Sequence, residues 1–142
     1  MTAKKRVADM EEYAREQART RLGKLAEEVE RASGEPNPDA IHDLRVSIRR
    51  FGQCLRIFGQ FFPAGKRRRV RKRLRKVMDL AAEIRDRDIA LELLSKAGVP
   101  ERYTVARMLA SERTRVETDL VAAIQRWHSR GFSEKWRVQL EL

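Results

Sequence analysis

Residues 41–62 read IHDLRVSIRRFGQCLRIFGQFF, and this stretch decides the fold. Its apolar residues follow one another at alternating spacings of three and four, which is the pattern of one face of an α-helix. They are Ile41, Leu44, Ile48, Phe51, Leu55, Phe58 and Phe62. A helix with so regular a stripe packs against other helices. Either Asn37, which precedes Pro38, or Asp39 is expected to cap its start.

The remaining segments are also helical in composition. Ala, Leu, Glu, Lys and Arg dominate them, and no apolar residues alternate with a period of two. Gly and Pro breaks predict helices at about 4–32, 38–62, 66–97 and 101–128, with a short C-terminal segment at about 132–140. Val7 and Met10 begin the apolar stripe of the first helix, whereas Asp88 and Arg113 interrupt the stripes of the third and fourth. We therefore expect one all-α domain over residues 1–142, an antiparallel four-helix bundle with long amphipathic helices.

The positive charge of the chain is concentrated locally. There are 32 Lys and Arg against 21 Asp and Glu, which gives a formal net charge of +11. Residues 66–76, KRRRVRKRLRK, hold nine positive charges and no negative one. A local excess of this kind indicates a polyanionic target such as nucleic acid, an anionic membrane surface or inorganic polyphosphate.

Several classes of protein are not favoured by the composition. No secretory signal follows the first basic residues, and no apolar run is long enough to span a membrane, so we expect a soluble, cytoplasmic protein. The single cysteine, Cys54, is expected to be a buried, inert thiol. Two distant histidines and one cysteine supply too few ligands for a metal site, and no catalytic constellation stands out. We expect no enzyme activity, no metal and no cofactor.

A stripe of cationic side chains runs beside the apolar stripe of residues 41–62. Its members lie at positions i, i+3, i+7 and i+14 and therefore share one helix face. They are His42, Arg45, Arg49 and Arg56. Gly52 and Gly59 lie on the same face, where they leave room for a helix or a ligand at a propensity cost of ~1 kcal/mol each. Because residues 44–62 contain no acidic residue, these cations repel one another, and a multivalent anion would relieve the repulsion.

The third predicted helix adds further cations and two carboxylates. Arg67, Arg71 and Arg85 project to one side, and guanidinium groups bind phosphate oxygens bidentately. Asp86 and Asp88 lie on different faces of the helix, so they cannot hold one metal ion together. We expect each to orient an Arg or His42 from a neighbouring helix, with Asp88 buried. The alternative for Asp88 is an ordinary ion pair with Arg85 or Arg87.

Two motifs of this chain occur together in a known family. The first is Ile41-His42-x-x-Arg45-Val46-x-x-Arg49-Arg50, followed by Arg56 and Phe58, and the second is Arg85-Asp86-x-Asp88. Over about residues 5–128 the chain resembles the CHAD family, the "conserved histidine α-helical domain". The resemblance implies helical bundles whose basic residues bind inorganic polyphosphate, an association with polyphosphate granules, and no catalytic activity.

The resemblance also implies roles for individual residues. The phosphate-contacting set would be His42, Arg45, Arg49, Arg50, Arg56, Lys66, Arg67, Arg68, Arg71, Lys72, Arg75, Lys76 and Arg85. Within it, His42 would donate a hydrogen bond that strengthens on protonation, and Asp86 and Asp88 would orient the cations. Family members are usually longer, with two related bundles, and this chain resembles a single N-terminal half. A homodimer is expected to complete the site.

Two other functions remain open from the sequence alone. The first is a basic helical protein that binds nucleic acid weakly through its phosphates, although only nine aromatic residues are present and most fall on core stripes. The second is a histidine phosphotransfer bundle with His42 as the phosphoacceptor. The dense arginines and scarce carboxylates around His42 favour retention of a long anion over the transient docking of a phosphotransfer partner.

Overall fold

The computed structural model describes residues 2–142, so Met1 of the predicted domain lies outside the described residues. The all-α class is confirmed, since the regular structure of this part of the chain is entirely helical. The elements are α1 (Ala3–Gly34), α2 (Pro38–Ile57), the 3-10 turn η1 (Gly59–Phe61), α3 (Ala64–Lys96), α4 (Thr104–Ser129) and α5 (Phe132–Gln139).

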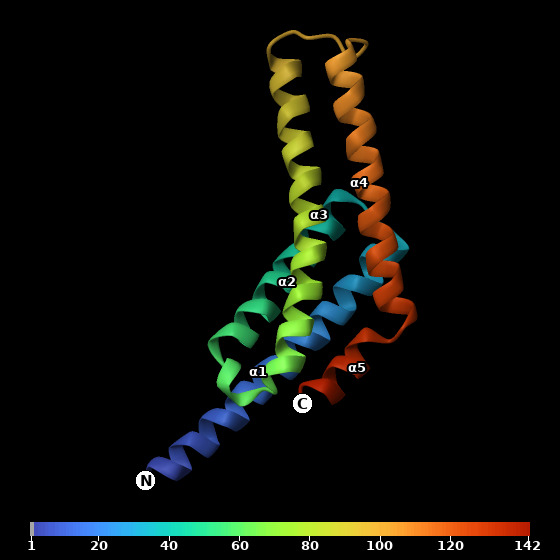
Figure 1. The fold of residues 1–142 in the computed structure, drawn as a ribbon. Helices are drawn as coiled ribbons and strands as arrows, with labels where there is room; N and C mark the ends of the chain where they lie inside the picture. Colours follow the sequence, from blue (N-terminus) through green and yellow to red (C-terminus); the bar gives the residue numbers. More distant parts are fainter. Residues whose placement is uncertain (1) are drawn as a thin grey trace.

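The helices form two antiparallel hairpins of unequal length (Figure 1). The α3–α4 hairpin is the longer, and the α1–α2 hairpin packs across its lower half, so that α1 contacts α4 and α2 contacts α3. The short α5 contacts α1, α3 and α4 at the lower end. Above the α1–α2 connection, α3 and α4 pair only with each other. A regular four-helix bundle along the full helix lengths is therefore not confirmed.

The apolar stripe of residues 41–62 lies in the core. Leu44, Ile48, Phe51 and Leu55 are at most 1% exposed, whereas Ile41 and Phe58 are partly buried against the same core. The helix ends at Ile57, earlier than predicted, because the chain tightens into η1 before Pro63. The core nevertheless continues past this end, since Phe62 is buried as well.

The two ends of α1 differ from each other in their surroundings. Val7 and Met10 were expected on a packed stripe, but they are 56% and 52% exposed. The reason is that the first turns of α1 extend past the other helices (Figure 1).

The start of α2 is capped by Asn37. Its Oδ1 accepts a hydrogen bond of 2.8 Å from the N–H of Ala40, with Pro38 in the first turn. Asn37, not Asp39, therefore caps α2.

An aromatic cluster closes the lower end of the core. Trp136 of α5 stacks on Phe51 of α2, with ring centroids 6.2 Å apart, and meets Trp127 of α4 edge-on at 5.3 Å.

Cys54 lies in the core at 4% exposure, and burial raises the pKa of its thiol, as expected of an inert cysteine. Within residues 2–142, no helix has the length and apolar character that a membrane crossing requires.

Candidate anion-binding site

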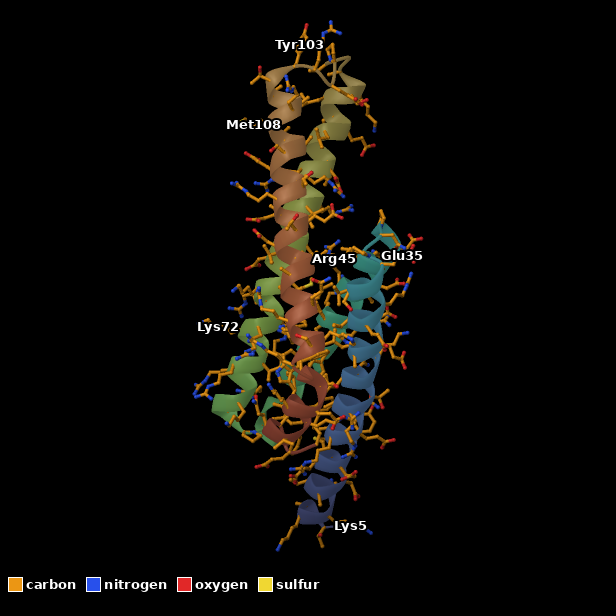
Figure 2. All side chains as sticks on the ribbon, turned by 90° about the vertical axis from the view of Figure 1, so that its right-hand side faces the viewer. Lys5, Glu35, Arg45, Lys72, Tyr103 and Met108 are labelled. Atoms are coloured by element: carbon orange, nitrogen blue, oxygen red, sulfur yellow. The ribbon has the colours of Figure 1, made fainter. Side chains whose placement is uncertain are left out.

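The two sequence motifs meet in one groove between α2, α3 and α4. This upper groove has a volume of about 170 Å³. His42 and Arg45 line it from α2, and Arg85 and Asp88 line it from α3. Figure 2 shows Arg45 between α2 and the α3–α4 hairpin. Side chains far apart in the sequence thus face a common space because α2 crosses α3 at this height.

A second groove continues the cationic stripe along α2 and α3. This lower groove has a volume of about 250 Å³, and four arginines line it: Arg49 and Arg56 from α2, and Arg71 and Arg75 from α3. Gly52 forms part of its wall. The backbone of α2 at Gly52 therefore opens the space in which arginines from two helices face each other.

The outer surface of α3 extends the cationic surface beyond the lower groove. A shallow depression there is lined by Arg69, Lys72, Arg73, Arg75, Lys76 and Asp79. Arg75 also lines the lower groove, so the two are continuous. Lys72 points outward from α3 on the side away from α1 (Figure 2). The cationic run of residues 66–76 thus coats the N-terminal half of α3.

The cations predicted to contact phosphate have no carboxylate partners. Among the described residues, none of them takes part in an ion pair; the paired cations are Arg15, Arg19, Lys24, Arg31, Arg87, Lys96, Arg113 and Arg137. Moreover, the buried Nε atoms of Arg45 and Arg67 have no hydrogen-bond acceptor within residues 2–142. An unsatisfied buried donor costs about 1–3 kcal/mol. An anion in the grooves would relieve the repulsion and could satisfy the Nε of Arg45, which lines the upper groove, whereas Arg67 lines neither groove.

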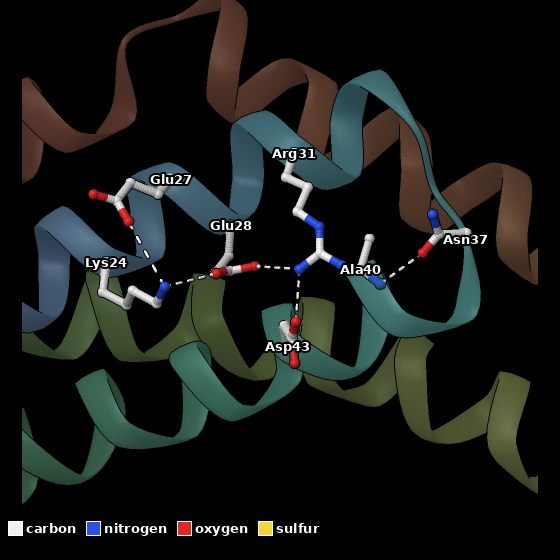
Figure 3. Close-up of polar contacts among 7 residues, drawn as sticks. All are labelled: Lys24, Glu27, Glu28, Arg31, Asn37, Ala40 and Asp43. Atoms are coloured by element: carbon white, nitrogen blue, oxygen red, sulfur yellow. Dashed lines mark hydrogen bonds and ion pairs between the residues drawn. The ribbon is translucent and has the colours of Figure 1, made fainter.

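The carboxylates near the upper groove are engaged elsewhere. Asp43 follows His42 in the sequence, but its Oδ2 accepts a 2.6 Å hydrogen bond from Arg31 Nη1 of α1 (Figure 3). This bond lowers the pKa of the Asp43 carboxyl. Arg31 also lies 3.4 Å from the buried Glu28, which pairs with Lys24 at 3.0 Å. The network joins α1 to α2 and pairs Asp43 with a cation outside the predicted phosphate-contacting set.

Arg113 neutralises the two carboxylates that line the upper groove. It lies on α4, and its Nε donates to Asp88 of α3 while its Nη1 donates to Glu117 at 2.9 Å. The hydrogen bond to Asp88 raises the pKa of Arg113. Asp88 therefore orients a basic side chain of a neighbouring helix, but that residue is Arg113 and not His42. The expectation that Asp88 is buried is wrong, because its side chain is 49% exposed.

Some of the predicted residues lie outside the grooves. Arg50, Lys66, Arg68 and Asp86 are exposed and line neither the grooves nor the depression on α3. Arg50 follows Arg49 and is therefore turned by about 100° around the helix axis, away from the stripe. Asp86 has no hydrogen-bond or ion-pair partner within the described chain, so it orients no cation there. The resemblance placed Arg50 in the site, whereas Lys66 and Arg68 were included as members of the cationic run and Asp86 as an expected orienting carboxylate.

Three functional candidates did not appear among the predicted site residues. Arg69 and Arg73 lie in the cationic run and line the depression on α3. Arg113 does not belong to this run, but the sequence contained a signal for it, since it interrupts the apolar stripe of its helix. An arginine at such a position needs a carboxylate partner on a neighbouring helix.

The two glycines of the stripe differ in the space around them. A Cβ atom added at Gly59 would overlap the guanidinium group of Arg67. A Cβ added at Gly52 would lie 3.7 Å from Leu74 Cδ1, which is an ordinary van der Waals contact. Gly59 therefore accommodates Arg67 from α3, whereas the space at Gly52 would also accept a methyl group.

Comparison with known proteins identifies the family. The model of the CHAD domain matches residues 16–141, which is nearly the whole chain. The chain therefore belongs to the CHAD family, which is associated in general with polyphosphate binding. No curated protein and no solved structure matches the chain.

Alanine substitutions at the two glycines should have opposite effects on stability. Gly52→Ala should raise the free energy of unfolding by about 0.5–1 kcal/mol, because it removes backbone freedom from the unfolded chain without a clash. Gly59→Ala should lower it by about 1 kcal/mol or more, because Arg67 must be displaced. Urea unfolding followed by circular dichroism measures both changes. A stabilising Gly59→Ala would contradict the close packing of Arg67.

Proposed function

We propose that this protein is a binding module for inorganic polyphosphate, without catalytic activity, and that it associates with polyphosphate granules. The observation that carries the proposal is the row of unpaired cations along two connected helices. His42, Arg45 and Arg85 line the upper groove, and four arginines line the lower one. A linear polymer with one negative charge or more on every phosphate is matched to such a row.

The chemistry of the cations supports phosphate as the ligand. Most are arginines, whose planar guanidinium groups form paired hydrogen bonds with phosphate oxygens and remain charged at all working pH values. The apolar stripe of α2 lies directly beside them in the core, so their backbone positions are rigid. A rigid array loses little conformational entropy when the polymer binds.

Nucleic acid is the alternative ligand, and the grooves favour it less. Single strands bind by stacking their bases on aromatic side chains. No Phe, Tyr or Trp lines either groove or the depression on α3. Tyr13 and Tyr103 are exposed, but they lie away from these three surfaces. Phosphate contacts without stacking favour a polymer that has no bases.

Reversing two charges of the stripe should abolish most of the binding. Arg45→Glu with Arg49→Glu should weaken the affinity for long-chain polyphosphate about 100-fold or more, because two charge-assisted contacts become repulsive. The helical circular-dichroism signal should be unchanged. Lys4→Glu with Lys5→Glu makes the same change in formal charge at the far end of α1 and should have little effect. Calorimetry at fixed salt measures the affinities.

Competition separates the two ligand classes. Polyphosphate bound to the wild-type protein should resist displacement by RNA or DNA at equal phosphate concentration. Displacement at equal concentration would overturn the choice of polyphosphate. An unchanged affinity of the Arg45→Glu, Arg49→Glu variant would instead show that the grooves are not the site.

Arg113 should act on binding through the two carboxylates that it pairs. Arg113→Gln leaves Asp88 and Glu117 unneutralised beside Arg45 and Arg85, so the affinity for polyphosphate should fall about tenfold. Adding Asp88→Asn to this variant should recover part of the loss. Calorimetric titration of the single and double variants provides the comparison. If Asp88→Asn recovers nothing, Arg113 contributes only its own charge.

We further propose a homodimer that juxtaposes two cationic faces. The part of the α3–α4 hairpin beyond α1 and α2 carries large exposed apolar side chains, including Leu93 at 62%, Met108 at 53% and Tyr103 at 52% exposure. Tyr103 and Met108 lie at the end of the hairpin farthest from Lys5 (Figure 2). Apolar surface of this kind supports an interface between two copies of the chain.

Light scattering coupled to size-exclusion chromatography tests the dimer. The wild-type protein should have twice the mass of one chain, and Leu93→Glu with Met108→Glu should reduce it to the mass of a monomer. Val138→Glu, at a residue that is 79% exposed on α5, serves as the control and should remain dimeric. A monomeric wild type, with and without polyphosphate, would rule out the dimer.

A further inference from the structure

A cavity of about 530 Å³ lies between α3, α4 and α5, apart from both grooves of α2. Five cationic side chains line it, namely Arg73 and Lys76 of α3, Arg126 of α4, Arg130 directly after α4, and Lys135 of α5. No Asp or Glu lines this cavity. Its volume falls within the range of about 300–1,000 Å³ that is typical of small-molecule sites. Three helices thus contribute positive charge, and only positive charge, to one concave space.

The five cations have no ion-pair partner among residues 2–142. Glu134 is near Lys135 in the sequence, but it lies 4.0 Å from Arg137. Arg126 and Arg130 are one helical turn apart, and like charges at this spacing destabilise a helix by about 0.2–0.5 kcal/mol. Arg73 and Lys76 lie three residues apart on α3 and are also neighbours on its surface. The protein therefore maintains a repulsive cluster that a multivalent anion would stabilise.

The floor of the cavity is aromatic and rigid. Trp127, Phe132 and Trp136 line it and are at most 9% exposed. Their ring centroids lie 5.0 to 5.5 Å apart in tilted and edge-to-face contacts. An apolar floor lowers the local dielectric constant, so the attraction between the cations and an anion is stronger than at an open surface. Because the rings are buried, they shape the cavity and offer no free face for stacking.

The backbone between α4 and α5 brings the cations together. Gly131 adopts a left-handed conformation with φ of 61° and ψ of 50°. Glycine adopts this conformation without a steric penalty, and it allows a sharp turn directly after a helix. Arg130 and Phe132 flank this turn, and both line the cavity. The sharp turn directs α5 back so that Lys135 faces the arginines of α4.

We propose that this cavity is a second anion site, which binds a compact anion carrying several phosphate groups. The charge density requires a multivalent ligand, and a concave space bounded by three helices, with cations on each side, favours a short phosphate chain over a long extended polymer. The arginines supply bidentate contacts to phosphate oxygens, and the lysines supply point charges at the rim. Arg73 and Lys76 also line the depression on α3, so the cavity adjoins that part of the cationic surface. The inference nevertheless goes beyond the proposed function, because none of the five cations lines the upper or lower groove.

Tryptophan fluorescence reports on this cavity directly. The chain has two tryptophans, Trp127 and Trp136, and both line it. Titration of the wild-type protein with tripolyphosphate, at constant ionic strength, should produce a saturable change in emission and a matching calorimetric heat. Arg126→Gln with Arg130→Gln should weaken this binding about tenfold or more, because two charge-assisted contacts are lost.

The control removes the same charge from the same helix. Arg107→Gln with Arg115→Gln lies on α4 away from the cavity and should leave the titration unchanged. Circular dichroism should show that both variants are folded. The proposal is overturned if calorimetry detects no binding of tripolyphosphate, or if Arg126→Gln with Arg130→Gln does not weaken that binding. It is also overturned if the control variant weakens the binding equally, or if sulfate of equal total charge gives the same titration curve.

The same variants separate this inference from the proposed function. If the cavity is the second site, Arg126→Gln with Arg130→Gln should lose the fluorescence response and retain binding of long-chain polyphosphate in the grooves. If the wild-type protein binds long-chain polyphosphate but responds to tripolyphosphate in neither fluorescence nor calorimetry, the second site is overturned and the proposed function stands. Loss of long-chain binding only in Arg45→Glu with Arg49→Glu would support the groove function independently.

Discussion

Burial of the apolar stripe of α2 is the constraint on which the rest of the structure depends. Leu44, Ile48, Phe51 and Leu55 are almost completely buried. Burying a side chain of this size stabilises the fold by about 1.5–3 kcal/mol. The stripe determines the rotation of α2 about its axis, and this rotation directs Arg45 and Arg49 toward α3. The cationic face is thus a geometric consequence of the core.

The distribution of the carboxylates determines where the protein remains positively charged. Asp43 is engaged by Arg31 of α1, and Asp88 and Glu117 are engaged by Arg113 of α4. These pairs are partly exposed, so each contributes little to stability. Their greater consequence is electrostatic: the acidic residues closest to the upper groove are neutralised by cations that are not members of the predicted set. Among residues 2–142, the arginines that the predicted set contributes to the two grooves take part in no ion pair and are available to an anion.

Several features could be predicted from the sequence because they depend on local periodicity. Spacings of three and four placed His42 and Arg45 on one face of α2, and both line the same groove. Helical periodicity also indicated that Gly52 and Gly59 lie beside this face, but it could not say what fills the space. The stripe of α1 shows the limit of the method. Val7 and Met10 have the correct spacing and remain exposed, because no other helix extends that far.

The sequence by itself determined the helices, the burial of the stripe of residues 41–62 and the alignment of cations beside it, since each follows from side-chain order within one helix. The tertiary structure alone decided which helices meet. It paired Asp88 with Arg113, seated Arg67 against Gly59, and joined Arg73 of α3 to Lys135 of α5 around one cavity. The physical reason is that contacts between helices depend on their crossing and relative height, which the periodicity of a single helix does not contain.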